Sequence, residues 1–269
     1  MRTVKIQGGL GNQLFGLAFA RSLRLADGGP VALDVASYRW DKYGRRFMVG
    51  EIAERIGELP IVQRPLLAHR LSSAAARLAP VAVPGFNRET PPGEGFDLSA
   101  LAGRQGYFDG YWQDEAYILG GEAWPSLFGD FVRARAAPSK DPADLVIHYR
   151  TYKEENHPAF SLAPGRDYFL RALEVVEKSV PSRSDIVLVS DDAALALDRI
   201  GDIGRGVVVR DSGGWADDMA LMLDARALIL TNSSFSWWAG YFGRADVVTY
   251  PRRGRLFHYP RPAARYICC

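Results

Sequence analysis

The chain has 269 residues, of which 48% are hydrophobic and 24% are charged, a balance typical of a soluble globular protein. This length suits one large or two small domains with a sizeable core, which excludes a disordered or fibrous protein and a large multidomain assembly. The 33 basic and 31 acidic residues give a net charge of +2, so the chain lacks the basic excess of a non-specific nucleic-acid binder.

Cysteine use and hydropathy predict a cytoplasmic protein. The two cysteines, Cys268 and Cys269, are the last residues, so we expect neither a disulfide framework nor a cysteine-ligated metal site within the fold. The longest apolar run is shorter than the roughly 18 residues of a membrane span, and a strand-like segment begins by Val4 with no apolar leader before it. Peripheral attachment to the inner face of the membrane is the alternative to a freely cytoplasmic location.

The first half of the chain begins as an α/β structure. A strand over Val4–Gln7 is followed by a glycine-rich loop, a helix over Asn12–Ala26 and a second strand over Val31–Val35. Residues 79–96 are rich in proline and glycine, so we expect an irregular surface connection there.

A loose stretch over residues 136–142, with Pro138 and Pro142, separates this half from the next. We therefore predict two domains, residues 1–139 and residues 140–269.

The second half alternates short β-branched runs with helical patterns. Apolar residues recur at helical spacing between the runs, as in Tyr168–Val176 and Met219–Leu223. This alternation favours right-handed crossovers and a mostly parallel sheet, so we predict a Rossmann-like domain. The predicted strands are Leu145–Tyr149, Ile186–Ser190, Val207–Arg210, Leu228–Thr231 and Val247–Tyr250.

Polar side chains follow three of these strands where each strand ends. They are His148 and Arg150 after the first, Asp191 and Asp192 after the second, and Asn232, Ser233 and Ser234 after the fourth. Ligands of open α/β sheets bind outside the carboxyl ends of the strands, so we expect these residues at one edge. An arginine, an acidic pair and a serine-rich helix start together favour an anionic, hydrogen-bonding ligand such as a nucleotide.

Each of these residues also has a structural interpretation. Arg150 suits a phosphate oxygen but could instead form an ion pair with a carboxylate. Ser233 and Ser234 could bind phosphate or sugar oxygens; the alternative is that Asn232 or Ser233 caps the helix Phe235–Phe242. Asp191 could accept from a base or ribose, or begin a helix.

A histidine and three aromatic residues near this edge also have two interpretations each. His148 lies in a buried strand pattern, where it is either a ligand contact or a satisfied core histidine. Phe235, Trp237 and Trp238 fit core packing better than a platform for a sugar ring.

The amino-terminal loop Gly8–Gln13 joins a strand to a helix. Its glycines permit close approach of a ligand to the backbone, and the helix start favours anions. The spacing matches neither the dinucleotide fingerprint nor the Walker loop, and a glycine-rich turn without a ligand is the alternative.

Missing motifs narrow the chemistry. The sequence contains no Asp-x-Asp pair and no recognisable histidine ligand spacing, so a bound metal is not expected. It also contains no G-x-S-x-G elbow and no internal cysteine, which leaves nucleophilic hydrolase chemistry without a residue to perform it. Two Rossmann-like domains facing a cleft, with phosphate contacts and no metal, fit nucleotide-sugar transfer of the glycosyltransferase-B type.

Residues 4–243 contain an ordered series of motifs. They are Gly8-Gly-Leu-Gly-Asn-Gln-Leu-Phe15, Leu33-Asp34, Tyr107-Phe-Asp-Gly-Tyr-Trp-Gln113, Ile147-His-Tyr-Arg150, Val189-Ser-Asp-Asp192 and Thr231-Asn-Ser-Ser-Phe-Ser-Trp-Trp-Ala239. In this order and separation the series resembles the bacterial α-1,2-fucosyltransferase family. The resemblance implies an inverting, metal-independent transferase of glycosyltransferase-B architecture, which moves L-fucose from GDP-fucose to a galactoside-type hydroxyl in surface glycan or oligosaccharide synthesis.

The resemblance also assigns roles to residues. The amino-terminal domain would take the acceptor, and its loop with Gly9, Gly11, Asn12 and Gln13 would face the donor sugar. The carboxyl-terminal domain would bind the nucleotide sugar. There the implied donor contacts are His148, Arg150 and Lys153, together with Asp191, Asn232, Ser233, Ser234 and Phe235.

One departure from the family pattern motivates alternatives. The family motif continues as H-x-R-R-G-D, whereas Arg150 is followed here by Thr151, Tyr152 and Lys153. A related transferase with another nucleotide-activated sugar is therefore the first alternative, and a catalytically silent sugar-nucleotide-binding protein is the second. The candidates for the base that takes the acceptor proton are Glu154, Glu155, His157 and Asp109.

Overall fold

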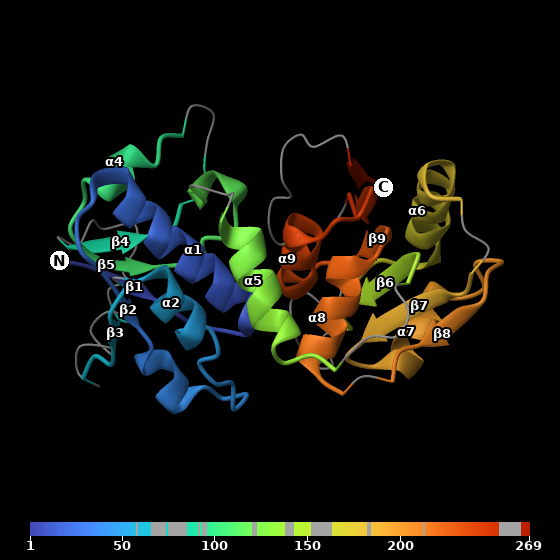
Figure 1. The fold of residues 1–269 in the computed structure, drawn as a ribbon, viewed down its shortest axis with the longest axis horizontal. Coiled ribbons are helices and arrows are strands. Elements are labelled where there is room, and N and C mark those ends of the chain that lie inside the picture. Colours follow the sequence, from blue (N-terminus) through green and yellow to red (C-terminus); the bar gives the residue numbers. More distant parts are fainter. Residues whose placement is uncertain are drawn as a thin grey trace. The chain divides into compact units, whose positions relative to one another are not determined.

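The computed structural model describes residues 1–57, 59–65, 74, 85–90, 92, 96–119, 123–137, 143–151, 163–181, 184–211, 213–252 and 265–269. The chain divides into two compact units, Met1–Ala123 and Trp124–Cys269. Each unit contains its own parallel β-sheet with helices (Figure 1), so the prediction of an α/β fold with parallel sheets is confirmed.

Among its described residues, the first unit has five strands in the order β3-β2-β1-β5-β4, and every pair is parallel. Its elements are β1 (Arg2–Lys5), α1 (Leu10–Asp27), β2 (Val31–Asp34), η1 (Ala36–Trp40), α2 (Gly50–Ile56), β3 (Ile61–Val62), β4 (Phe86–Arg88), α4 (Ser99–Ala102), β5 (Gly106–Asp109) and η2 (Glu115–Tyr117). The long helix α1 buries Leu14, Phe15 and Leu17, and ends at Gly28, whose φ of 71° allows its N–H to bond the Arg24 carbonyl.

Strand β4 corrects one expectation. We expect residues 79–96 to be irregular, yet Phe86–Arg88 pairs with β5 as an edge strand. The backbones of the two strands approach each other very closely at Gly85 and Gly106, since a Cβ atom on Gly106 would lie 2.0 Å from the Gly85 carbonyl oxygen. The pairing depends on this contact with a distant strand rather than on local β-propensity, which explains why the local composition did not predict it.

In the part of the second unit that the structure describes, six strands lie in the order β11-β10-β9-β6-β7-β8, again all parallel. The chain runs from β6 outward to β8, returns to the other side of β6, and continues outward through β9 and β10 to β11. This is the doubly wound Rossmann order. The elements are α5 (Ala123–Arg133), β6 (Leu145–Tyr149), α6 (Arg166–Ser179), β7 (Ile186–Ser190), α7 (Ala193–Ile200), β8 (Val207–Val209), α8 (Trp215–Asp224), β9 (Ala227–Leu230), α9 (Ser234–Phe242), β10 (Val247–Tyr250) and β11 (Tyr266–Cys268).

The two faces of this sheet are covered by different helices. Leu145, Ile147 and Tyr149 of β6 belong to one core cluster with residues of α6 and α7. The intervening residues of a strand point to the opposite face. There the His148 ring lies 5.8 Å from the ring of Phe235 in α9.

Helix α5 belongs to the second unit. Its aromatic residues Trp124 and Phe128 pack against Phe242 of α9, and Phe131 stacks on Trp215 of α8. The division between the compact units falls after Ala123, the first residue of this helix, whereas from composition we expect a boundary after residue 139.

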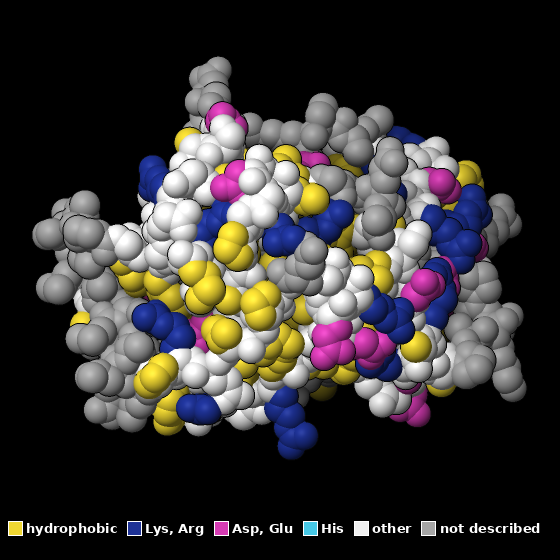
Figure 2. Space-filling model, turned by 60° about the vertical axis from the view of Figure 1, so that its left-hand side comes forward, with side chains coloured by type: hydrophobic (Ala, Val, Ile, Leu, Met, Phe, Trp, Pro, Cys, Tyr) yellow, Lys and Arg dark blue, Asp and Glu magenta, His cyan; other side chains and the backbone are white. Residues whose placement is uncertain are grey.

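No helix in the described part of the chain combines the length and apolar composition that a membrane crossing requires. On the face drawn in Figure 2, basic side chains lie scattered among acidic and hydrophobic ones. This distribution agrees with the small net charge of the sequence.

Candidate functional site

The predicted donor-site residues meet at the point where the strand order of the second unit reverses. Strands β6 and β9 are neighbours, with His148 opposite Leu230, so the residues that follow them leave the sheet side by side. The Arg150 N–H donates a hydrogen bond to Thr231 Oγ1 at 2.9 Å. In open α/β sheets, ligands bind outside the carboxyl ends of the strands at such a reversal.

Asp191 is held by the residues that follow β6. Arg150 Nη1 lies 3.1 Å from Asp191 Oδ2, and the N–H and hydroxyl of Thr151 both donate to Asp191 Oδ1, at 2.8 and 2.9 Å. The structural alternative for Arg150, an ion pair, is therefore present. The Arg150 side chain is still 46% exposed beside Asp191, so its planar guanidinium, a group that suits phosphate oxygens, remains accessible from solvent.

Thr151 is a residue whose role the sequence did not reveal. It is fully enclosed by the fold, and both of its donors serve Asp191. At this position the resembled motif has a second arginine. The contact could have been foreseen only from the register that places Tyr149 opposite Ser190.

The start of α9 supplies backbone donors at the same edge. Ser233 is the N-cap, and its Oγ accepts a hydrogen bond from the Phe235 N–H at 3.3 Å. Asn232 and Ser233 are buried, whereas Ser234 and Phe235 are partly exposed. The capping interpretation is thus realised for Ser233. The first turn of the nine-residue helix still carries N–H groups and a dipole that favour an anion.

His148 is buried behind this edge. Its Nδ1 has no hydrogen-bond partner among the described residues. Burial lowers the pKa of His148 to about 4, with the Arg150 charge acting in the same direction and Asp191 opposing it. The imidazole is therefore neutral at pH 7 and adds no positive charge to the site.

The two tryptophans of α9 belong to the core, whereas Phe235 is partly exposed. Trp237 and Trp238 are both buried and present no ring face to solvent. Trp237 stacks on Tyr241, and Trp238 contacts the same ring edge-to-face. The preference for core packing over a sugar platform at these two residues is confirmed.

Four predicted site residues, Lys153, Glu154, Glu155 and His157, lie outside the described residues. Of the base candidates, the described part of the chain contains only Asp109.

The glycine-rich loop of the first unit lies at the corresponding edge of its sheet. Gly8 has a φ of 80°, Gly9 is the N-cap of α1, and the helix begins at Leu10, two residues earlier than expected. Asn12 is therefore not the cap. Its Oδ1 instead accepts a hydrogen bond from Gln113 Nε2 at 2.8 Å, while Gly11 is buried in the first turn.

Gln13 has a structural task in this loop. Its side chain is completely buried, and its Nε2 donates to the carbonyls of Gly8 and Arg46 at 3.2 and 2.8 Å. Its Oε1 accepts from the Met48 N–H at 2.7 Å. These bonds use the amide to join α1 to the segment before α2, so Gln13 acts on the loop through positioning.

Asp109 ends β5 beside the same loop. Its Oδ1 lies 2.9 Å from Lys5 Nζ, and the residue is 9% exposed. The loop that follows is held by Glu89, whose carboxylate accepts from the N–H groups of Tyr111 and Gln113. Lys5 and Glu89 were not among the predicted site residues.

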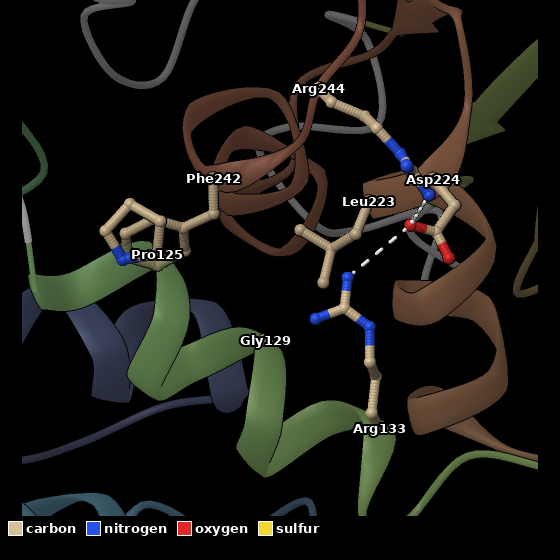
Figure 3. A pocket seen from close by; sticks show the side chains of 7 residues that line it. All are labelled: Pro125, Gly129, Arg133, Leu223, Asp224, Phe242 and Arg244. Atoms are coloured by element: carbon tan, nitrogen blue, oxygen red, sulfur yellow. Dashed lines mark hydrogen bonds and ion pairs between the residues drawn. The ribbon is translucent and has the colours of Figure 1, made fainter.

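A pocket of about 130 Å³ lies elsewhere in the second unit, between α5 and the ends of α8 and α9 (Figure 3). Arg133 and Arg244 both point toward the carboxylate of Asp224, at 3.5 and 2.5 Å. None of the predicted site residues lines this pocket. Its remaining walls are Pro125, Gly129, Leu223 and Phe242.

Within the described ranges, no three His, Cys, Asp or Glu side chains gather closely enough to hold a metal ion. The metal-independent reaction remains an expectation from the sequence motifs.

Comparisons with solved structures find many remote likenesses. NodZ α-1,6-fucosyltransferase soaked with GDP-fucose, from Bradyrhizobium, is 13% identical with a TM-score of 0.46, covering 92% of this chain and 93% of that one. POFUT1 in complex with GDP is 13% identical with a TM-score of 0.40, covering 99% and 97%. E. coli heptosyltransferase WaaC with ADP is 10% identical with a TM-score of 0.46, covering 100% and 93%. Because these sequence identities and TM-scores are low, the fold assignment rests on the strand order of the two sheets.

A search of the curated proteins finds no significant match. The family model described as glycosyl transferase family 11 matches residues 154–252, which is less than half of the chain. The matched segment contains Asp191 and the Asn232–Phe235 helix start, and it begins shortly after Arg150. This segment is therefore similar to glycosyl transferase family 11.

Proposed function

We propose that this protein is a glycosyltransferase that moves L-fucose from GDP-fucose to a galactoside-type hydroxyl, forming an α-1,2 linkage with inversion and without a metal ion. One observation carries the proposal. Arg150 and the start of α9 follow the two strands between which the sheet order reverses, the position at which such sheets bind nucleotides. The match of residues 154–252 to a glycosyltransferase family model supports it.

The chemistry needs positive charge on the departing diphosphate. The acceptor oxygen forms a bond to the anomeric carbon while the bond from that carbon to the phosphate oxygen breaks, and GDP leaves with the bonding electrons. Arg150 and the N–H groups at the start of α9 would stabilise the charge that develops on GDP. Because Asp191 and Thr231 hold Arg150 before the ligand arrives, little reorganisation is needed.

The proton of the acceptor hydroxyl must pass to a base. Asp109 is one candidate, since it ends β5 of the first unit, although Lys5 already contacts it. Glu154, Glu155 and His157 remain candidates from the sequence. In the same proposal, the second unit binds the nucleotide and the first unit binds the acceptor.

Release of GDP or UDP from GDP-fucose, GDP-mannose and UDP-galactose, measured with a panel of galactosides, tests the donor and the reaction together. We expect release from GDP-fucose that depends on the acceptor. Turnover with another nucleotide sugar instead would contradict GDP-fucose as the donor. This alternative is motivated by the departure from the family motif at Thr151–Lys153. Tight binding of GDP without turnover of any donor would favour the silent sugar-nucleotide-binding protein.

A further inference from the structure

Arg210, at the carboxyl end of β8, is a charged residue that the proposed function does not use. Its N–H donates to the Leu188 carbonyl at 2.8 Å, which continues the pairing of β8 with β7 past Val209. The side chain is only partly exposed, and its Nε is buried without a hydrogen-bond partner in the described chain. A buried donor on a charged group costs free energy when it has no acceptor, so this group requires an explanation.

The strand register places Arg210 at the edge of the sheet that carries the candidate site. Arg210 lies beside Val189 of β7, and His148 of β6 lies on the other side of Val189. Residues in one row of a parallel sheet point to the same face, here the face on which the His148 ring lies 5.8 Å from that of Phe235. Two buried nitrogens without a hydrogen-bond partner among the described residues, His148 Nδ1 and Arg210 Nε, therefore belong to one row.

The two aspartates that follow β7 already have other partners. Asp191 pairs with Arg150 at 3.1 Å. Asp192 Oδ1 accepts from the Leu195 N–H at 3.1 Å and so caps α7. Within the described ranges, Arg210 forms an ion pair with neither of them. The guanidinium of Arg210 is therefore available to an acceptor that does not belong to this part of the chain.

The span from the proposed diphosphate site to β8 fits a nucleoside diphosphate. That site lies between β6 and β9, and β8 is the second strand from β6 on the other side (Figure 1). At a strand spacing of roughly 4.8 Å, the reversal point and β8 are about 12 Å apart. An extended nucleoside diphosphate covers such a span from its phosphates to its base. In doubly wound sheets the ribose lies near the end of the second strand, here β7, so the base comes to β8.

A guanidinium at this position distinguishes guanine from the other bases. Guanine presents two acceptors side by side, O6 and N7, and an arginine donates to both in one planar, bidentate contact. Adenine carries an amino group in place of O6, which would face the arginine as a second donor. Pyrimidines have no N7 and offer the arginine a single acceptor. An arginine without a carboxylate partner at the base position therefore favours a guanine nucleotide.

We propose that Arg210 binds O6 and N7 of a guanine base and gives this site its preference for a guanosine diphosphate. The inference rests on the proposed function, which it deepens by naming the residue that selects the base of the donor. Arg150 and the start of α9 hold the diphosphate in that proposal. Arg210 therefore determines affinity and base specificity, and does not act in the chemical step.

Isothermal titration of the full-length protein with nucleotides tests the assignment. The wild type should bind GDP about tenfold more tightly than 7-deaza-GDP, which has a C–H group in place of N7, and more tightly still than ADP. Arg210→Met keeps an unbranched side chain without the donors. It should lower the affinity for GDP by about 10- to 100-fold and bind GDP and 7-deaza-GDP equally.

Two further variants separate base recognition from charge and from folding. Arg210→Lys keeps the positive charge without the planar fork, so it should also fail to distinguish GDP from 7-deaza-GDP. Arg205→Met is the matched control, because Arg205 precedes the same strand at its opposite end and contacts Glu177 and Ser184. It should retain the preference of the wild type for GDP. Circular dichroism of each variant checks that the fold is intact.

The outcomes distinguish this inference from the proposed function. An Arg210→Met protein that still prefers GDP to 7-deaza-GDP overturns the role of Arg210 and leaves the proposed function standing. Full recovery of GDP affinity in Arg210→Lys also overturns it, since charge alone would then be enough. A preference for GDP that depends on Arg210, without transfer of fucose to any acceptor, supports the inference while the proposed function fails. A wild-type protein that binds ADP or UDP but not GDP overturns both.

Discussion

Removal of a single hydroxyl at Thr151 tests whether Asp191 is held as the structure shows. Thr151→Val keeps the size and branching of the side chain and the backbone N–H bond to Asp191, and removes only the Oγ1 hydrogen bond of 2.9 Å. Thr151→Ser is the matched control, because it keeps the hydroxyl.

The size of the effect follows from burial and charge. Hydrogen bonds to charged groups contribute roughly 1.5 to 3 kcal/mol to stability. Because Thr151 is only 1% exposed, no water can take the place of its hydroxyl as a donor to Asp191. Asp191 keeps the Thr151 N–H and the Arg150 guanidinium, which favours the lower end. We expect a loss of about 1.5 to 2 kcal/mol in the free energy of unfolding of the second unit. Since Asp191 also orients Arg150, the affinity for GDP should fall as well.

Urea unfolding followed by circular dichroism measures the first effect, and isothermal titration with GDP measures the second. With a slope near 2 kcal/mol per molar urea, typical slopes being about 1 to 3, the midpoint for Thr151→Val should lie about 1 M below that of Thr151→Ser. Equal midpoints and equal affinities in the two variants would show that the Thr151 hydroxyl does not hold Asp191.

Two further predictions concern buried polar side chains. In the folded protein the pKa of His148 is lowered from 6.5 to about 4. As the pH falls, the unfolded chain therefore binds a proton at this histidine before the folded chain does. The contribution of the neutral imidazole to the free energy of unfolding is fully present above pH 6.5, and about 3 kcal/mol is lost as the pH drops toward 4. His148→Gln should flatten that part of the plot of urea midpoint against pH, and an unchanged plot would contradict the burial of a neutral imidazole. Gln13→Leu should destabilise the first unit by about 2 kcal/mol, because it removes the side-chain hydrogen bonds to Gly8, Arg46 and Met48. The Kd for GDP should stay unchanged. A large rise in that Kd would instead show that Gln13 contacts the donor.

Most strands of the second unit could be predicted because β6, β7, β9 and β10 are largely buried on both faces, whereas the exposed edge strand β8 was predicted from its run of valines alone. Their β-branched runs carry a local signal, and each of the five predicted strands agrees with the structure to within about one residue at either end. The sixth strand, Tyr266–Cys268, is short, partly exposed and at the edge of the sheet, so its sequence carries little signal. Its pairing with β10 is a long-range contact that no local pattern encodes.

The candidate site could be predicted in its composition but not in its internal contacts. The rule that polar residues after parallel strands share one edge was enough to group Arg150, Asp191 and Ser233. The Arg150–Asp191 ion pair depends on the register between β6 and β7, which a sequence of buried residues does not fix. The strand order, which places the reversal between β6 and β9, likewise follows only from the assembled sheet.

The central claim is that Arg150 and the start of α9 bind one diphosphate. Isothermal titration of GDP and of guanosine with Arg150→Ala tests it most directly. Arg244→Ala serves as the control, because Arg244 is also an exposed arginine paired with an aspartate in the second unit. We predict that Arg150→Ala lowers the affinity for GDP by about 10- to 100-fold and leaves guanosine binding unchanged, while Arg244→Ala changes neither. An Arg150→Ala protein that binds GDP as tightly as the wild type, or that loses guanosine and GDP equally, would contradict the claim.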